Sequence, residues 1–290
     1  FKKPFLTNLI NEIKKGSGFF TEAYTQKEKK EFFTFLFKHE PWSKLKPKEK
    51  KEMLTSPGGY TRSGYVSPHT SIFIINHFGE EFSDADNAIL IRFGKVFEQA
   101  YTRFLDLQKA ETQTREAQIE AALERVRSRS MAMHNSSEML EVADVLFQQL
   151  RSLGGNLWGC GVVICQKEVD DDKVYFANEK GVLPPITMPH TEDSTHHKMY
   201  KGWVNELELY SEFKEGKELE AHYEYMLSLP VVKPIFENIL ASGLSFPTWQ
   251  KWHAAYFKFG YLLIITLEPY KDEKIFARFA KVFDQAYTRF

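Results

Sequence analysis

The stretch "RFGKVFEQAYTRF", residues 92–104, returns as "RFAKVFDQAYTRF" at residues 278–290. Only Gly94/Ala280 and Glu98/Asp284 differ, so eleven of the thirteen aligned positions are identical. The offset between the copies is 186 residues, far longer than the roughly 20 to 50 residues of a solenoid unit. The repeat therefore indicates a duplicated domain, and a chain of 290 residues is long enough for two domains.

The likeness extends upstream of the repeated helix. Aromatic-rich helical patterns, "EFFTFLFKHEPW" and "LEAHYEYMLSLPVV", each end near a proline. A strand follows in each copy, "SIFIIN" from Ser71 and "GYLLIIT" from Gly260, rich in β-branched and aromatic residues. An acidic turn then leads into the repeated helix. Each unit therefore ends in helix, loop, strand, turn and helix.

The second copy has a front half that the first copy lacks. It consists of a helix "SSEMLEVADVLFQQLRSLGG" and the strands "WGCGVVICQ" and "KVYFANEKG", which we expect to be joined by a hairpin at "VDDDK". In the first copy, "GYTRSGYVSPHT" predicts no regular element. We predict an α+β fold with a truncated first unit at 1–104 and a complete second unit at 135–290, each with an antiparallel sheet and flanking helices.

Between the units, residues 105–134 predict a long helical connector without Gly or Pro. Apolar residues recur there at the a/d spacing of a coiled coil, and we interpret them as the seam of a homodimer: Ile119, Leu123, Val126 and Met133. The alternative is that this stripe packs on the chain's own domains. A polar break follows, in which Asn135 and Glu138 are placed as a capping box.

Composition excludes several classes of protein. The chain is 43% hydrophobic with a net charge of −1, so a core is available and phosphate neutralisation is not its main task. No apolar run is long enough to span a membrane. Cys160 and Cys165 are too few for a disulfide scaffold, and a reducing cytoplasm fits best. Alternating arginines at 125–129 leave nucleic-acid binding as an alternative, although nearby glutamates favour a solvated helix.

A small-molecule pocket is the site that the aromatic residues favour, because rings with a few polar groups line such pockets. The ligand-binding candidates are Trp203, His222, Trp249, Trp252, His253 and Tyr256. The alternatives are that these rings form core, or that His222 and the region 249–256 form an enzyme active site. No G-x-S-x-G, P-loop, H-E-x-x-H or G-x-G-x-x-G motif is present.

Histidines gather in "HTEDSTHHKMYKGW", residues 190–203. Because His196 and His197 are adjacent, they point about 100° apart on a helix and do not form a two-histidine metal face. We interpret this segment as a solvated loop that leads into an amphipathic helix. No metal site and no cofactor are predicted.

Three segments carry a resemblance to a known class. These are "FLDLQKAETQTREAQIEAALERVRSRSMAMHNSSEMLEVADVLFQQLRSLG", "GKELEAHYEYMLSLPVVKPIFENIL" and "YFKFGYLLIITLEPY". They resemble the tandem GAF-like sensory regions of bacterial multi-domain signalling proteins of the sensor histidine kinase type. The resemblance implies a cytoplasmic, dimeric, non-catalytic sensory region of a two-component system. It also implies that the connector passes the signal to an output domain of the same chain beyond Phe290.

Overall fold

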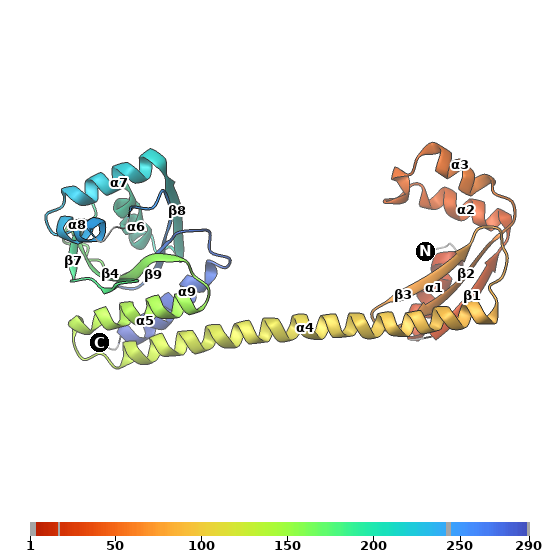
Figure 1. Cartoon of the computed structure of the whole chain (residues 1–290), viewed down its shortest axis with the longest axis horizontal. Helices are drawn as coiled ribbons and strands as arrows, with labels where there is room; N and C mark the ends of the chain where they lie inside the picture. Colours follow the sequence, from red (N-terminus) through yellow and green to blue (C-terminus); the bar gives the residue numbers. More distant parts are fainter. Residues whose placement is uncertain (1–3, 17, 242–244, 289–290) are drawn as a thin grey trace. The chain divides into compact units, whose positions relative to one another are not determined.

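A computed structural model describes residues 4–16, 18–241 and 245–288. The chain forms two compact units, 1–113 and 114–290. Their boundary lies inside the predicted connector 105–134 and inside helix α4 (Asp84–Met131), which contributes residues to both units (Figure 1). Arg289 and Phe290, the last residues of the repeated motif, lie outside the described residues.

Unit 1 is a three-stranded antiparallel sheet of order β1-β2-β3 with helices around it. Phe5 of the first helix packs among aromatic rings of the strands and the second helix to form the core. In chain order, the elements are α1 (Pro4–Lys15), β1 (Gly18–Tyr24), α2 (Gln26–Leu36), the short η1 (Trp42–Lys44), α3 (Pro47–Thr55), β2 (Tyr60–Val66), β3 (Ser71–Asn76) and the first part of α4.

Strand β2 corrects the prediction of an irregular "GYTRSGYVSPHT". The polar Arg62 hides the strand pattern, yet this side chain is buried in the structure. Its guanidinium forms an ion pair with Glu22 of the neighbouring β1 at 2.6 Å and donates a hydrogen bond to the Phe5 carbonyl at 2.8 Å. A buried charge is tolerated where it is paired and hydrogen-bonded.

Unit 2 is built on one larger antiparallel sheet of order β6-β5-β4-β10-β9-β8, with β7 paired to β5. After the last part of α4, the elements are η2 (Ser136–Glu138), α5 (Met139–Ser152), β4 (Leu157–Ile164), β5 (Asp171–Asn178), β6 (Gly181–Val182), β7 (Ile186–Pro189), α6 (Ser194–Val204), β8 (Leu209–Glu215), α7 (Gly216–Ser228), α8 (Lys233–Ala241), β9 (Trp249–Phe257), β10 (Gly260–Thr266) and α9 (Lys274–Tyr287).

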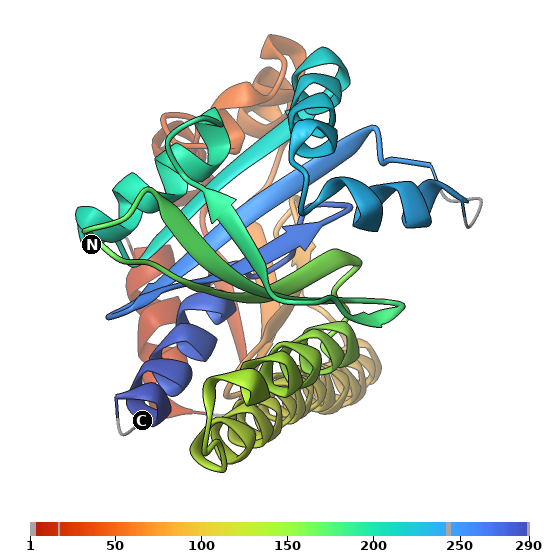
Figure 2. The same cartoon turned by 90° about the vertical axis from the view of Figure 1, so that its left-hand side faces the viewer.

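The sheet of unit 2 is covered on both faces, as Figure 2 shows. The end of α4, α5 and α9 pack on one face, and α6, α7 and α8 lie over the other. Because side chains alternate along a strand, Ala255 and Phe257 of β9 belong to the first core, whereas Trp252 and Ala254 belong to the second. The two faces therefore have separate apolar interiors.

The two units share one order of elements. α1, β1, α2, α3, β2, β3 and α4 of unit 1 correspond to α6, β8, α7, α8, β9, β10 and α9 of unit 2. The described part of unit 1 has no counterpart of α5, β4 or β5. Both units, as far as the structure describes them, are α+β with antiparallel sheets.

Local packing explains the two differences between the repeated helices. Gly94 lies so close to the Tyr65 ring that a Cβ would meet its Cδ1 atom at 2.2 Å. The carboxylate of Glu98 accepts hydrogen bonds from Ser67 at 2.6 Å and Thr70 at 2.9 Å, in the loop between β2 and β3. The shorter Asp284 instead accepts from the Lys258 amide at 2.9 Å, in the tighter β9–β10 turn. Both acids secure a hairpin loop to the helix.

The predicted dimer seam requires correction. Its side chains are only 1–6% exposed, and all belong to the core that α4, α5 and α9 form within unit 2: Ile119, Leu123, Val126 and Met133. This is the alternative in which the stripe packs on the chain's own domain. The a/d spacing describes an intrachain helix pair equally well, because both geometries bury one stripe of a helix.

Several boundaries follow the sequence prediction and others do not. The strands 71–76 and 260–266 are confirmed. The chain reverses at 165–170, so the acidic residues 171 and 172 begin β5 instead of forming the hairpin turn. Asn135 caps η2 by accepting a hydrogen bond from the Ser137 amide.

Among the described helices, none has a stretch long and apolar enough to cross a membrane.

Candidate functional site

A cavity of about 70 Å³ lies in unit 2 between the sheet and the helices α6, α7 and α8. Apolar side chains from β4, β5, β9 and β10 form its floor, and residues of α7 and α8 close it from above. Its walls include Trp158, Phe176, Met226, Phe236 and Leu263. A cavity of this size holds several water molecules or a small organic group.

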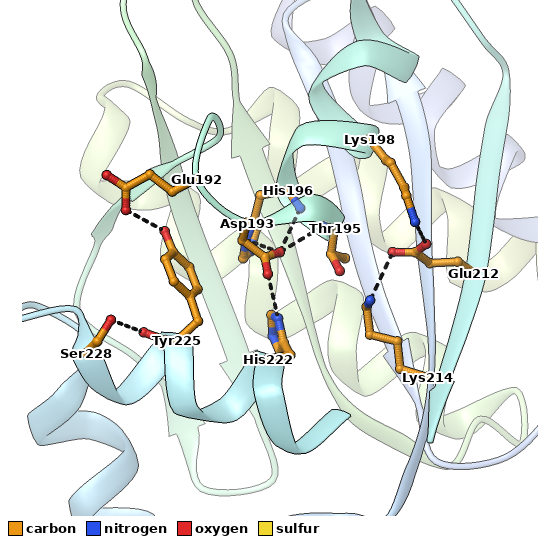
Figure 3. A network of polar contacts seen from close by, with 10 residues as sticks. All are labelled: Glu192, Asp193, Thr195, His196, Lys198, Glu212, Lys214, His222, Tyr225 and Ser228. Carbon is orange, nitrogen blue, oxygen red and sulfur yellow. Dashed lines mark hydrogen bonds and ion pairs between the residues drawn. The ribbon is translucent and has the colours of Figure 1, made fainter. Parts of the chain in front are cut away.

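A polar cluster centred on Asp193 (Figure 3) borders this cavity through His196 and His222. Asp193 is the N-cap of α6, and its Oδ2 atom accepts hydrogen bonds from the amides of Thr195 at 2.9 Å and His196 at 3.1 Å. Its other oxygen, Oδ1, lies 3.4 Å from Nδ1 of His222 on α7. One carboxylate therefore ties α6 to α7 and orients the His222 imidazole, which lines the cavity together with His196.

Burial and pairing oppose each other in this cluster. Burial raises the pKa of the Asp193 carboxyl, but hydrogen bonds with His196 and His222 and the charges of these rings outweigh burial and lower the pKa overall. Burial lowers the pKa of His222, although Asp193 partly offsets this effect. At neutral pH the Asp193 side chain is therefore a carboxylate.

Trp252 of β9 contacts this cluster. Its ring meets the His222 ring edge to face, with the centroids 4.6 Å apart, and the side chain is 4% exposed. Its indole N–H is buried and finds no hydrogen-bond acceptor among the described residues. An unpaired buried donor costs free energy, so the Trp252 N–H is available to a molecule that brings an acceptor within its reach.

A second buried acid, Asp172 of β5, also lines the cavity. Its Oδ1 lies 3.2 Å from Nδ1 of His190, without the alignment of a hydrogen bond, and both side chains are 3% exposed. Burial raises the pKa of Asp172, while the charge of His190 lowers it to a lesser degree. The His190 ring stacks on Tyr200 with the centroids 3.7 Å apart. The histidine-rich segment forms the predicted amphipathic helix, α6, after the exposed residues 191 and 192, but His190 and His196 are buried where we expected a solvated segment.

Two of the six predicted ligand residues, His222 and Trp252, line the cavity. His253 lies on the opposite face of the sheet, where its Nδ1 is 2.8 Å from the Ser211 hydroxyl. Trp203 and Tyr256 line a separate, open depression, and Trp249 lines neither. The structure therefore does not bring the six residues together.

Sequence reasoning missed Asp193, His196 and Asp172. The two-residue alternation of a strand separates Trp252 from His253 and could have excluded His253 from any site that contains Trp252. The pattern "EDSTHH" holds an Asp one residue before a helical run, which is the signal of an N-cap. That signal could have placed Asp193 beside His196, but not beside His222, which comes from another helix.

The cavity can hold a small, mainly apolar molecule and can donate a hydrogen bond to it from Trp252. The imidazoles of His196 and His222 add polar groups to the lining, and the Asp193 carboxylate contacts both rings. Among the residues that the structure describes, no group of three or more His, Cys, Asp or Glu side chains is arranged to hold a metal ion.

No protein family model matches the chain, and no curated protein matches it in sequence at a significant level.

Proposed function

We propose that this chain is a non-catalytic sensory region of a signal-transduction protein, and that unit 2 binds a small molecule in the cavity above its sheet. The observation that carries the proposal is the cavity itself. Its lining is mainly apolar, with polar groups from Asp172, His196, His222 and Trp252, and Asp193 contacts the two imidazoles from outside the lining. Ligand sites typically combine an apolar lining with a few oriented polar groups.

The ligand class follows from the lining. Apolar walls favour a compact hydrocarbon or aromatic body, and the unpaired indole N–H of Trp252 favours one hydrogen-bond acceptor on that body. A phenol or a short-chain carboxylic acid has this chemistry. His222 and its neighbour His196 line the same cavity and offer further polar contacts.

The route of the signal follows from the layers of unit 2. The cavity uses one face of β9 and β10, while α9 packs against the other face of these strands. α9 in turn packs beside the end of α4, because Arg278 donates to Glu116 and Glu120, each at 2.7 Å. A molecule that shifts the sheet would bias the packing of α9 and α4, which is the coupling that a sensor requires.

The first test is binding to the full chain with p-cresol and hexanoate as probes. We expect saturable binding by calorimetry, which Trp252→Phe weakens about tenfold because it removes one buried hydrogen bond. Trp203→Phe is the matched control, since it makes the same change at a tryptophan that does not line the cavity. Equal losses in the two variants, or no binding by either probe, would contradict the proposed pocket.

Hydrogen exchange tests the signalling part of the proposal. With a saturating probe, we expect altered exchange in α9 (Lys274–Tyr287) as well as in the cavity walls. Protection confined to α6, α7 and α8 would describe a binding module that does not signal through its helices.

A further inference from the structure

An open groove lies on the surface of unit 2 beside the cavity that we propose as the ligand site. Its volume is about 430 Å³, and it is lined by residues of the segment 178–186, by α8 and by Val231 in the turn before α8. Most of these residues are apolar or proline. Exposed apolar patches are uncommon on soluble proteins and often mark a binding groove.

The groove and the cavity share part of their walls. The residues that line both spaces are Asn178, Leu183, Ile186, Ile235 and Ile239. Two of them, Ile186 and Ile239, are buried. By contrast, Pro184 and Val231 line the groove alone and are exposed. The groove is therefore a passage from the surface of unit 2 to its cavity.

The volumes of the two spaces indicate how a ligand would use them. Ligand pockets typically measure roughly 300 to 1,000 Å³. The cavity of about 70 Å³ is far smaller than this, whereas the groove of about 430 Å³ lies within the range. A molecule of ordinary ligand size with one end in the cavity must therefore extend through the groove.

Prolines give the groove a fixed shape. Pro184 and Pro185 form part of one wall, and Pro234, near the start of α8, belongs to the other. Each pyrrolidine ring holds its backbone φ near about −65°. A groove whose walls are rigid before binding loses less conformational entropy when a ligand enters.

We infer that the ligand of unit 2 is a linear amphiphile, with a small polar head in the cavity and a hydrocarbon chain that leaves through the groove. This inference rests on the proposed pocket and specifies its ligand. The buried indole N–H of Trp252, which has no acceptor among the described residues, provides a contact for the head. The apolar walls of the groove provide the contact for the chain. A fatty acid longer than hexanoate has this chemistry.

The test is calorimetry of the full chain with hexanoate, octanoate and decanoate, each below the concentration at which it forms micelles. We expect the affinity to rise about threefold to fourfold with each added methylene group, because each one enters an apolar groove. Trp252→Phe should weaken binding of all three acids by a similar factor, since the head occupies the cavity whatever the length of the chain.

A pair of matched variants locates the chain. Val231→Glu should remove most of the dependence on chain length, because Val231 lines the groove and is 55% exposed in the empty protein. Val169→Glu should preserve this dependence. It is the same substitution at a valine that is 44% exposed and lines neither the groove nor the cavity.

The outcomes separate this inference from the proposed pocket. If hexanoate binds and longer chains bind no more tightly, or if p-cresol binds and no alkanoate does, the inference fails and the pocket stands. An equal dependence on chain length in Val231→Glu and Val169→Glu also overturns the inference, because the chain then lies outside the groove. An unchanged affinity of Trp252→Phe for decanoate contradicts a head placed in the cavity. Binding by none of these molecules overturns the pocket and the inference together.

Discussion

Two consecutive side chains of strand β9 point to opposite faces of the sheet and lie in different chemical environments. Trp252 faces the cavity, whereas His253, the next residue of β9, lies in the core beneath α9 with its ring 4.8 Å from that of Phe276. His253 is fully buried, and burial lowers the pKa of this imidazole to about 4, although Glu273 partly offsets the effect. It is a structural histidine of the core and not part of the candidate site.

The low pKa of His253 predicts a pH dependence of stability. In the unfolded chain its pKa is about 6.5, so between pH 6.5 and 4 the unfolded state binds a proton that the folded state does not. The stabilisation is fully present above pH 6.5 and is lost as the pH falls towards 4, by about 3 kcal/mol. Urea unfolding should show the natural chain losing about 3 kcal/mol of stability relative to His253→Gln as the pH falls from 7 to 4. A pH-independent difference would contradict the assignment.

Gly94 gives a second prediction at this scale. Gly→Ala within a helix normally stabilises by up to about 1 kcal/mol, but here the new Cβ would lie 2.2 Å from the Tyr65 ring. We therefore expect Gly94→Ala to lower the free energy of unfolding by about 1 to 3 kcal/mol, as overpacking does. Chemical denaturation measures the change in the free energy of unfolding, and a stabilising change would contradict the packing assigned to Gly94. Ala280→Gly, at the equivalent position of α9, should also destabilise, because it loses helix propensity.

At the scale of elements, α4 has two parts with different surroundings. Leu107 is 53% exposed and Leu123 is 3% exposed, although both lie on one uninterrupted helix. We expect Leu123→Ala to cost about 2 to 5 kcal/mol of stability in unit 2. Leu107→Ala should change stability by no more than about 0.5 kcal/mol in the monomer. Thermal unfolding of the two variants at low protein concentration makes the comparison, and equal effects would contradict the assigned packing.

The sequence predicted the elements whose patterns are strong and failed where tertiary contacts decide. The runs 71–76 and 260–266 are continuous and apolar, and they form strands as expected. β2 was missed because Arg62 is compatible with a buried strand only when Glu22 and the Phe5 carbonyl are adjacent, which no local pattern reveals. The seam at 119–133 was a true apolar stripe, but spacing alone does not say whether its partner is in the same chain.

The candidate site was predicted only in part, for the same reason. His222 and Trp252 were identified by residue type, yet the acid that orients His222 is 29 residues away in sequence. Asp193 joins the site because α6 and α7 lie over one face of the sheet. The contact between Asp193 and His222 depends on the tertiary fold. Only the role of Asp193 as the N-cap of α6 can be predicted from the local sequence.

At the scale of the whole molecule, the boundary between the two units along the sequence falls in a solvent-exposed part of α4. Every residue from 108 to 114 is exposed, so this stretch has the low local stability of a helix without tertiary support. Brief trypsin treatment should therefore cut first after Lys109. Arg115, six residues later, donates a hydrogen bond to the Leu153 carbonyl at 2.8 Å and should resist cleavage. Mass spectrometry of the early fragments would show this order, and first cleavage at Arg115 would contradict it.

The acid that secures each hairpin to its helix has a consequence for exchanging parts between the units. Glu98 reaches the longer loop at 67–70, and Asp284 reaches the tighter turn at Lys258. The length of each acid matches the loop that it hydrogen-bonds. If one loop is grafted into the other unit, the hydrogen bond to the helix is kept only when the acid is exchanged as well. The duplicated helix is thus less interchangeable than its sequence identity suggests, because the acid must match the length of its loop and position 94 must remain Gly beside Tyr65.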